Sequence, residues 1–277
     1  MIYTEIDFKI SPLQPASEIL IAELGELGFE SFVEEEDGLK AYIQGEDFDT
    51  NILQELFVMQ NPEFNITYQI HGIENENWNA KWESDYESVL IDNRCYIRAP
   101  FHKTNPDIEF EIEIEPKMSF GTAHHDTTSQ MISLLLNENV EGKDVLDMGC
   151  GTAVLAILAK MKKADNVHAI DNDEWAYNNS VENIGRNNFP EIIVQQGDAA
   201  LLKDKNFDVI LANINKNILL ADMETYSKSL NSKGVIMFSG FYINDLEDIK
   251  SKAEKNALVY IKHIDNNNWV AAKFSKK

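Results

Sequence analysis

The sequence predicts an α/β protein in which a doubly wound parallel sheet follows a smaller α+β domain. Three observations predict it. From residue 145 onward, short aliphatic runs alternate with segments of helical periodicity, as in proteins built from strand-helix-strand units. The first of these runs ends in the glycine loop Gly149-Cys150-Gly151. Before residue 71 the chain shows the order β-α-β-β-α-β instead, which is typical of a ferredoxin-like domain.

Residues 1–71 form the predicted N-terminal domain. Ile2, Thr4 and Ile6 alternate with polar side chains, which indicates a strand. The turn Asp37-Gly38 between two short runs indicates a hairpin. The predicted set is a strand at 2–8, a helix at 15–28, a hairpin at 31–43, a helix at 50–59 and a strand at 64–70.

Residues 72–93 form a predicted linker that contains a helix. The segment begins polar and rich in turn formers, and it then carries Trp78 and Trp82. These two side chains lie one helical turn apart and would share one face. We favour packing between the domains over stacking on a substrate as the role of this face.

Residues 94–277 form the predicted larger domain. It opens with strands at 94–99 and 108–114, and in the second strand a row of glutamates alternates with apolar side chains. We interpret this row as a solvated sheet face rather than a binding stripe. The other elements are a helix at 127–136, strands at 145–148, 167–170, 192–195, 209–212 and 235–238, helices at 154–161, 175–186, 218–229 and after 238, and a hairpin of 259–263 with 269–274.

Composition limits the possible functions. The formal net charge of −23 repels phosphate backbones, so we expect no direct nucleic-acid binding, whereas a basic partner would be attracted. Solubility alone explains the charge equally well. The chain has neither a basic, then apolar leader nor an apolar run of about 18 residues, so we expect a cytoplasmic protein without a membrane segment. Its only cysteines, Cys95 and Cys150, fit a reducing compartment. A monomer is the default expectation.

The first candidate site feature is the glycine loop. In open α/β sheets the ligand sits at the carboxyl ends of the strands. Gly149 and Gly151 would let the backbone approach a ligand closely, and Thr152 could begin the next helix. Because close packing of a helix on a strand also selects glycine, the loop alone indicates only a nucleotide-like ligand.

Carboxylates follow the next two predicted strands. Asp171 comes directly after the second strand, twenty residues beyond Gly151, where it could accept hydrogen bonds from both ribose hydroxyls of an adenosine. Capping of the following helix is the alternative, but Asp173 can serve as that cap. Asp198 follows the third strand and could accept the adenine amino group or cap a helix.

Asn213 at the end of the fourth strand favours methyl transfer over hydride transfer. Its carbonyl could hold a substrate amine beside an electrophilic methyl group. Methyl transfer from a sulfonium is an in-line displacement, in which positioning contributes up to about 7–11 kcal/mol. A dehydrogenase would need a proton donor, and we find no Tyr or Lys pair at the strand ends. Asn213 is therefore the predicted catalytic residue, and S-adenosylmethionine is the predicted cofactor.

A block of polar residues precedes the helix at 127–136. His124 and His125 suggest a metal, but neighbouring residues rarely ligate one ion together and no third ligand has suitable spacing, so we expect no metal. Asp126 is the predicted N-cap of the helix. The hydroxyl of Thr128 and the N–H groups of this turn could bind the carboxylate of the cofactor's methionine.

Taken together, these residues resemble the bacterial ribosomal protein L11 methyltransferases, the PrmA family. The Phe-Gly-Thr block with its paired threonines is the most specific element, whereas the N-terminal domain matches in pattern only. The matching segments keep the family's order between residues 78 and 240: Trp78 to Tyr86, Phe120 to Thr128, Val145 to Gly151, Ala169 to Asp173, Ala212 to Ile214, and Ser239-Gly240.

The resemblance implies a Rossmann-like methyltransferase sheet and an N-terminal substrate-recognition domain. It also implies methylation of lysine side chains in a ribosomal protein, with the N-terminal amine as an open alternative. By position, the residues contacting S-adenosylmethionine would be Thr128, Gly149, Asp171 and Asn213. In our hypothesis the lysine, with an ordinary pKa near about 10.4, loses its proton beside the sulfonium and attacks in line.

Two residues depart from the family pattern, and alternative functions stay open. Ala123 and Ala153 stand where the family usually has glycine, and each added methyl could narrow the pocket or shift a loop. A nicotinamide-dependent oxidoreductase would explain the glycine loop and Asp171 but not Asn213. A non-catalytic adaptor would explain the acidic charge. A small-molecule methyltransferase gives no reason for a separate N-terminal domain.

Overall fold

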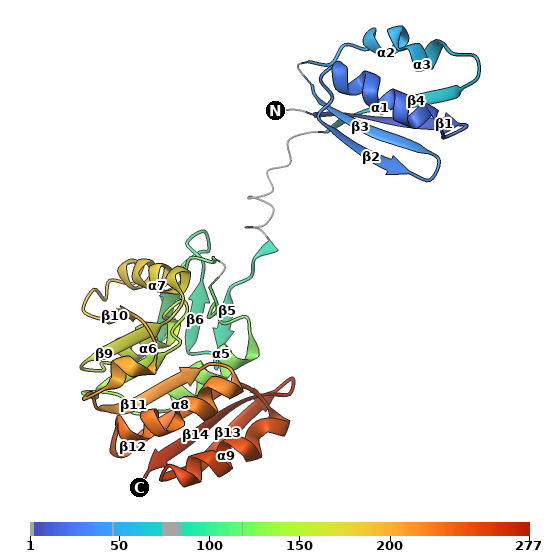
Figure 1. Ribbon diagram of the computed structural model, residues 1–277. Coiled ribbons are helices and arrows are strands. Elements are labelled where there is room, and N and C mark those ends of the chain that lie inside the picture. Colours follow the sequence, from blue (N-terminus) through green and yellow to red (C-terminus); the bar gives the residue numbers. More distant parts are fainter. Residues whose placement is uncertain (1–2, 46, 74–82, 84, 118) are drawn as a thin grey trace. The chain divides into compact units, whose positions relative to one another are not determined.

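The computed structural model describes residues 3–45, 47–73, 83, 85–117 and 119–277. The chain divides into two compact units, Met1–Asp85 and Tyr86–Lys277 (Figure 1). The predicted aromatic face of Trp78 and Trp82 lies outside the described residues.

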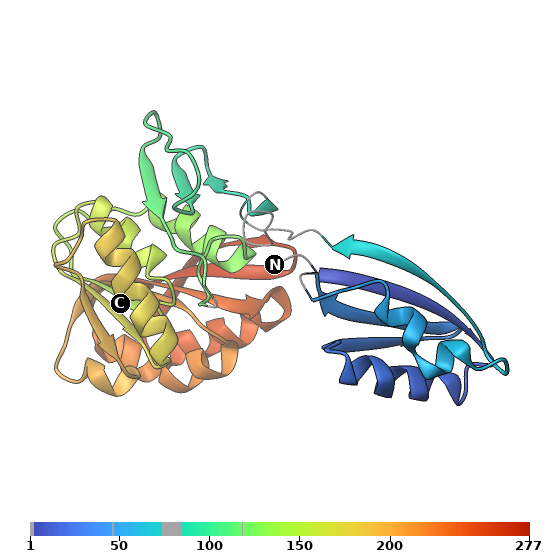
Figure 2. The same ribbon diagram turned by 90° about the horizontal axis from the view of Figure 1, so that it is seen from above.

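The N-terminal unit is a four-stranded antiparallel sheet of order β2-β3-β1-β4 with its helices on one face (Figure 2). Ile6 and Phe8 of β1 pack against Leu20 and Leu24 of α1, and all four side chains are buried. The elements are β1 (Tyr3–Ser11), α1 (Ala16–Glu26), β2 (Ser31–Glu35), β3 (Gly38–Gln44), α2 (Ile52–Glu55), α3 (Phe57–Gln60) and β4 (Asn65–Ile73).

The single helix expected at 50–59 is two short helices. Leu56 adopts an extended conformation between them, with φ −63° and ψ 129°. The carboxylate of Glu23 accepts the N–H groups of Phe57 at 2.9 Å and Val58 at 3.1 Å, so a side chain from α1 caps the second helix. This distant partner left no signal in the local sequence.

The second unit contains a seven-stranded sheet of order β10-β9-β8-β11-β12-β14-β13. Strands β8 to β12 run parallel, and the C-terminal hairpin of β13 and β14 adds two antiparallel strands. The chain reverses its direction of progress between β8 and β11, the position where ligands bind in open α/β sheets. The strands are β8 (Val145–Met148), β9 (Val167–Asp171), β10 (Ile193–Gln196), β11 (Phe207–Asn213), β12 (Leu230–Tyr242), β13 (Leu258–Asn266) and β14 (Trp269–Lys276).

Helices cover both faces of this sheet. Neighbouring strand residues point to opposite faces, so Val145 joins one core and Leu146 the other. On the first face lie α5 (Asp126–Leu136), α6 (Val154–Met161) and α7 (Glu174–Arg186); on the second lie α8 (Lys216–Lys228) and α9 (Leu246–Lys255), with the short helices η1 (Ala199–Leu202) and η2 (Ile243–Asp245). The doubly wound α/β prediction is thus confirmed.

A small sheet of β5 (Val89–Ile91), β6 (Cys95–Arg98) and β7 (Phe110–Glu113) begins the second unit. Strands β4 and β5 therefore occupy both ends of the segment 72–93 that the sequence assigned to a linker. The glutamate row of β7 is paired rather than simply solvated. Its ion pairs join Arg94 to Glu109, Arg98 to Glu111 and Glu113, and Arg186 to Glu113 and Glu115.

Two further findings concern the described part of the chain alone. No helix there is both long enough and apolar enough to cross a membrane. The same residues contain no group of three His, Cys, Asp or Glu side chains placed to hold a metal ion.

Candidate functional site

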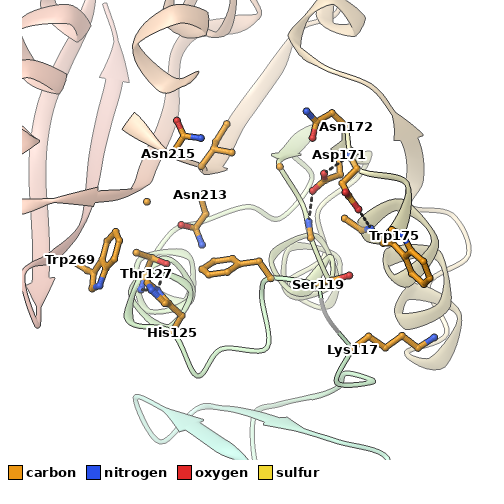
Figure 3. A pocket seen from close by; sticks show the side chains of 17 residues that line it. Lys117, Ser119, His125, Thr127, Asp171, Asn172, Trp175, Asn213, Asn215 and Trp269 are labelled. Carbon is orange, nitrogen blue, oxygen red and sulfur yellow. Dashed lines mark hydrogen bonds between the residues drawn. The ribbon is translucent and has the colours of Figure 1, made fainter. Parts of the chain in front are cut away.

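A pocket of about 870 Å³ lies at the carboxyl ends of the parallel strands (Figure 3). Residues at or just after the ends of β8, β9 and β11 contribute to its wall, together with Gly240 of β12, the segment before α5 and the first residue of β14. Its lining residues are Lys117, Ser119, Phe120, His125, Thr127, Gly149, Gly151, Asp171, Asn172, Asp173, Trp175, Ala176, Asn213, Ile214, Asn215, Gly240 and Trp269.

The glycine loop forms the floor between the two ends of the pocket. Gly149 and Gly151 have φ values of 68° and 54°, which favour glycine. A Cβ atom on Gly149 would lie 2.9 Å from Cγ2 of Ile214, and one on Gly151 would lie 2.2 Å from the carbonyl oxygen of Phe120. Both positions therefore favour glycine because of packing within the protein, the alternative that the sequence left open, and the predicted approach of a ligand to this loop stays a prediction.

Asp147 and Thr152 hold this loop in place. Oδ2 of Asp147 accepts the N–H of Ala156 at 3.0 Å, inside the protein. Burial raises the pKa of the Asp147 carboxyl to about 8. Thr152 is not the helix start that we expected. Its hydroxyl donates to the carbonyl of Gly121 at 2.6 Å, and Ala153 is the N-cap of α6.

Asp171 is the last residue of β9, and its side chain lines the pocket. Its Oδ2 accepts the N–H of Gly151 at 2.9 Å, and its Oδ1 accepts the N–H of Asp173 at 3.0 Å. Asp173 in turn caps α7 by accepting the N–H of Ala176 at 2.9 Å. A carboxylate can accept about four hydrogen bonds, so Asp171 retains capacity for two ribose hydroxyls.

Asn213 projects from the end of β11 into the pocket wall. Its Nδ2 donates to Oγ1 of Thr128 at 3.3 Å. Its Oδ1 is buried and has no hydrogen-bond partner among the described residues. A buried acceptor left unpaired costs about 1–3 kcal/mol. Because Asn213 lines the pocket, a donor on a bound ligand can pair with this oxygen.

The start of α5 differs by one residue from our prediction. His125, not Asp126, is the N-cap, because its side chain accepts the N–H of Thr127 at 3.3 Å. Asp126 instead accepts the side-chain amides of Asn266 and Asn267, which lie at the turn between β13 and β14. This contact fixes that turn beside the pocket.

Thr128 lies behind the pocket wall. Its side chain is 1% exposed, whereas its neighbour Thr127 lines the pocket. The structure therefore brings Thr128 to the site through its hydrogen bond with Asn213. The role predicted for it at the cofactor carboxylate remains a prediction.

Asp198 is not brought to this pocket. Its carboxylate accepts the N–H of Ala200 at 2.8 Å and caps η1. It lies on a separate groove with Lys203, Lys205 and Asp222. Of the two roles that the sequence allowed for Asp198, the structure shows helix capping.

Sequence reasoning missed an aromatic group at the Asn213 end of the pocket. The ring of His125 lies 5.1 Å from that of Phe120 and 4.8 Å from that of Trp269. Trp269 also packs against Tyr242 at 4.1 Å, and its carbonyl accepts from Gln130 at 2.9 Å. Trp269 lies 144 positions after His125, and no spacing rule connects them.

The two alanines that depart from the family pattern do not narrow the pocket. Ala123 and Ala153 are 1% and 0% exposed and belong to the core under α5 and α6. Neither lines the pocket. Both have left-handed backbone angles, with φ 68° and 64°, so each retains the conformation that glycine favours.

The pocket fits a nucleoside-containing cofactor that carries a reactive group near an amide. The floor excludes Cβ atoms, Asp171 can accept ribose hydroxyls, and Asn213 offers an unpaired acceptor. Gly149, Gly151, Asp171 and Asn213, four of the six predicted binding residues, line the pocket together. The chemistry of these residues fits S-adenosylmethionine.

Comparisons with known proteins identify the family of this chain. The model of the ribosomal protein L11 methyltransferase (PrmA) family matches residues 17–277. The ribosomal protein L11 methyltransferase of Phocaeicola vulgatus is 47% identical and covers 100% of both chains. That of Bacteroides thetaiotaomicron is 46% identical and covers 99% of this chain and 100% of its own. The crystal structure of a ribosomal protein L11 methylase from Lactobacillus delbrueckii subsp. bulgaricus matches with a TM-score of 0.65 and 26% identity, over 69% of this chain and 100% of that one.

The larger sheet is accordingly a Rossmann-like methyltransferase sheet. The sequence resemblance stated above is confirmed by the family match and by relatives that span the whole chain. The chain belongs to the ribosomal protein L11 methyltransferase (PrmA) family.

Proposed function

We propose that this enzyme methylates lysine side-chain amines of a basic ribosomal protein, the L11 named in its relatives, with the N-terminal amine as a further acceptor. The cofactor is S-adenosylmethionine, which supplies a methyl group on a positively charged sulfur. The observation that carries the proposal is the unpaired, buried Oδ1 of Asn213.

Asn213 accepts a hydrogen from the incoming amine. Its Nδ2 is engaged by Thr128 at 3.3 Å, which fixes the amide plane and directs the oxygen rather than the NH₂ group to the substrate. An amine that donates to this oxygen keeps its lone pair free for in-line attack. The contribution is positional, as expected for a displacement that needs no covalent enzyme intermediate.

Phe120, His125 and Trp269 line the substrate end of the pocket. Their apolar ring faces exclude water around the incoming amine. Desolvation next to a positive sulfur lowers the pKa of the lysine from its ordinary value near about 10.4. The lysine loses its proton before it attacks.

The N-terminal residues 1–71 would recognise the protein substrate, and residues 72–93 would connect the two parts. Two observations support this division. The N-terminal unit has its own buried core, and the residues that line the pocket all belong to the second unit. Its strong negative charge suits a basic protein. We place the enzyme in the cytoplasm as a monomer, with no direct contact to nucleic acid.

Labelled S-adenosylmethionine and ribosomal proteins from a strain lacking this gene test the proposal. The wild-type enzyme should label one large-subunit protein, and mass spectrometry should place the methyl groups on lysines. Asn213→Ala should lower the rate at least about 100-fold while changing the Kd for S-adenosylhomocysteine only severalfold.

Asn139→Ala is the matched control, because Asn139 is an exposed loop residue outside the pocket. Methylation by Asn213→Ala at the wild-type rate would refute the assignment of Asn213. Label that stays out of every ribosomal protein would favour a small-molecule substrate or a non-catalytic adaptor. The nicotinamide alternative is set aside because the chain belongs to a methyltransferase family.

A further inference from the structure

The two ends of the pocket differ in what lines them. Asn213 and Trp269 lie at one end, and Lys117, Asp171 and Trp175 lie toward the other (Figure 3). The ring contacts that join Phe120, His125 and Trp269 keep these three rings at the Asn213 end. Trp175 is the aromatic lining residue that takes no part in that group.

Trp175 contributes little to the core of the protein. Its side chain is 79% exposed, the highest value among the exposed large hydrophobic residues that the structure describes. Within the same described residues, no aromatic ring is found packed against it. The face of α7 that packs inward is formed by other residues, among them Ala176, Ser180 and Ile184. An indole left open at the rim of a pocket is a candidate ligand contact.

Hydrogen bonds fix Trp175 relative to Asp171. The carboxylate of Asp171 accepts the N–H of Asp173 at 3.0 Å, and the carboxylate of Asp173 accepts the N–H of Ala176 at 2.9 Å. Trp175 is therefore in a capped first turn whose position is set by the residue that receives the ribose. Asp171 also accepts the N–H of Gly151. Its carboxylate therefore connects the glycine loop to the first turn of α7 through hydrogen bonds.

We propose that Trp175 stacks on the adenine ring of S-adenosylmethionine. The methyl-bearing sulfur has to lie at the Asn213 end, and Asp171 accepts the ribose hydroxyls. The base then extends to the opposite side of Asp171, where Trp175 offers a free aromatic face. Asp198, the residue expected at the adenine amino group, lies on a separate groove. Stacking on Trp175 supplies binding energy for the base without a contact to that amino group.

Isothermal titration of the full chain with S-adenosylhomocysteine tests the proposal, because binding needs no protein substrate. Trp175→Ala should raise the Kd about 10-fold or more, as expected for loss of one base-aromatic stack. Trp175→Phe retains an aromatic face and should stay within about threefold of wild type. Phe57→Ala removes another exposed aromatic side chain, which is 63% exposed and belongs to the N-terminal unit, and should leave the Kd unchanged.

Tryptophan emission gives an independent readout. S-adenosylhomocysteine should quench the wild type more than Trp175→Phe, although both bind it. A Kd for Trp175→Ala within about twofold of wild type, or equal quenching of the wild type and Trp175→Phe, would overturn the stacking role. If Trp175→Ala misfolds, the quenching of the folded Trp175→Phe variant still decides. These outcomes are independent of which amine is methylated.

Discussion

The two units of the chain use charged residues in different ways. Residues 1–85 hold 19 acidic and 3 basic side chains, whereas residues 86–277 hold 28 and 21. The formal charges are therefore −16 and −7, so the smaller unit carries most of the excess. A field of this kind raises the rate of encounter with a basic partner and falls with ionic strength. The catalytic unit, with a formal charge of −7, attracts a basic partner less strongly.

The pairing of these charges differs in the same way. In the N-terminal unit the exposed Lys9 is shared by Asp7, Glu35 and Asp37. In the catalytic unit Arg98 is 10% exposed and holds Glu111 at 2.7 Å and Glu113 at 2.8 Å. The first arrangement leaves negative charge open to a partner. The second joins the small sheet into one ion-paired network.

The largest expected effect is a difference in the sign of pH dependence. Burial raises the pKa of Asp147 to about 8, against about 3.9 in an unfolded chain. Between these values the folded unit holds a proton that the unfolded chain lacks. The contribution of Asp147 to the free energy of unfolding of the catalytic unit should therefore fall as the pH rises from about 4 to about 8. Asp147→Asn keeps an acceptor for the N–H of Ala156 and should flatten this slope in denaturant titrations.

In the N-terminal unit the pKa values of two carboxyl groups are lowered instead of raised. The hydrogen bond from Lys9 lowers the pKa of both Glu35 and Asp37. Their contribution is present above the ordinary carboxyl pKa and is lost as the pH falls through the lowered folded values. Lys9→Met should reduce this loss on the acid side. For the catalytic unit, Asp147→Asn should not keep the wild-type slope of the free energy of unfolding between about pH 4 and 8. If it did, Asp147 would not be the cause of that pH dependence.

The second prediction compares the two cations directly. Arg98→Ala should lower the free energy of unfolding by about 2–3 kcal/mol, because two partly buried glutamates lose their cation. Lys9→Ala should change it little, since exposed ion pairs contribute little in water. Urea unfolding of both variants measures the difference. Equal effects would mean that burial does not distinguish the two networks.

The pocket shows which parts of a site can be predicted from sequence. Gly149, Asp171 and Asn213 were predicted because each lies at the carboxyl end of a strand, and the carboxyl ends of parallel strands converge. Asp198 follows a strand too, but its side chain caps its own helix. Two hydrogen-bonding roles were open to that carboxylate, and the local sequence does not choose between them.

Contacts between segments that are distant in sequence determine the features that the sequence did not predict. Trp269 reaches the pocket because the amides of Asn266 and Asn267 bind Asp126 across 140 and 141 positions. The break after α2 likewise depends on Glu23, more than thirty positions away. Periodicity and capping patterns describe a local window. They therefore predicted the order of elements and the strand-end residues, but not these partners.

The smallest expected effect tests whether the two units unfold separately. Gly25 and Gly185 are each the last residue but one of their helices, α1 and α7, and a Cβ atom at either would meet nothing within 4 Å. Gly25→Ala and Gly185→Ala should each add about 0.5–1 kcal/mol to stability, through helix propensity and lower entropy of the unfolded chain. Gly151→Ala is the contrasting control, because its Cβ would meet a backbone oxygen at 2.2 Å.

Calorimetry of the full chain measures the stability gain of each variant as a shift in melting temperature. An equal gain in free energy raises the melting temperature more in a small unit, by roughly 4–8 °C per kcal/mol for about 60–100 residues against 2–4 °C for about 150–250. Gly25→Ala should therefore move an early transition by about twice as much as Gly185→Ala moves a later one. If both variants shift a single transition equally, the units unfold together, and the pH slopes assigned to each would have to be read as properties of the whole chain.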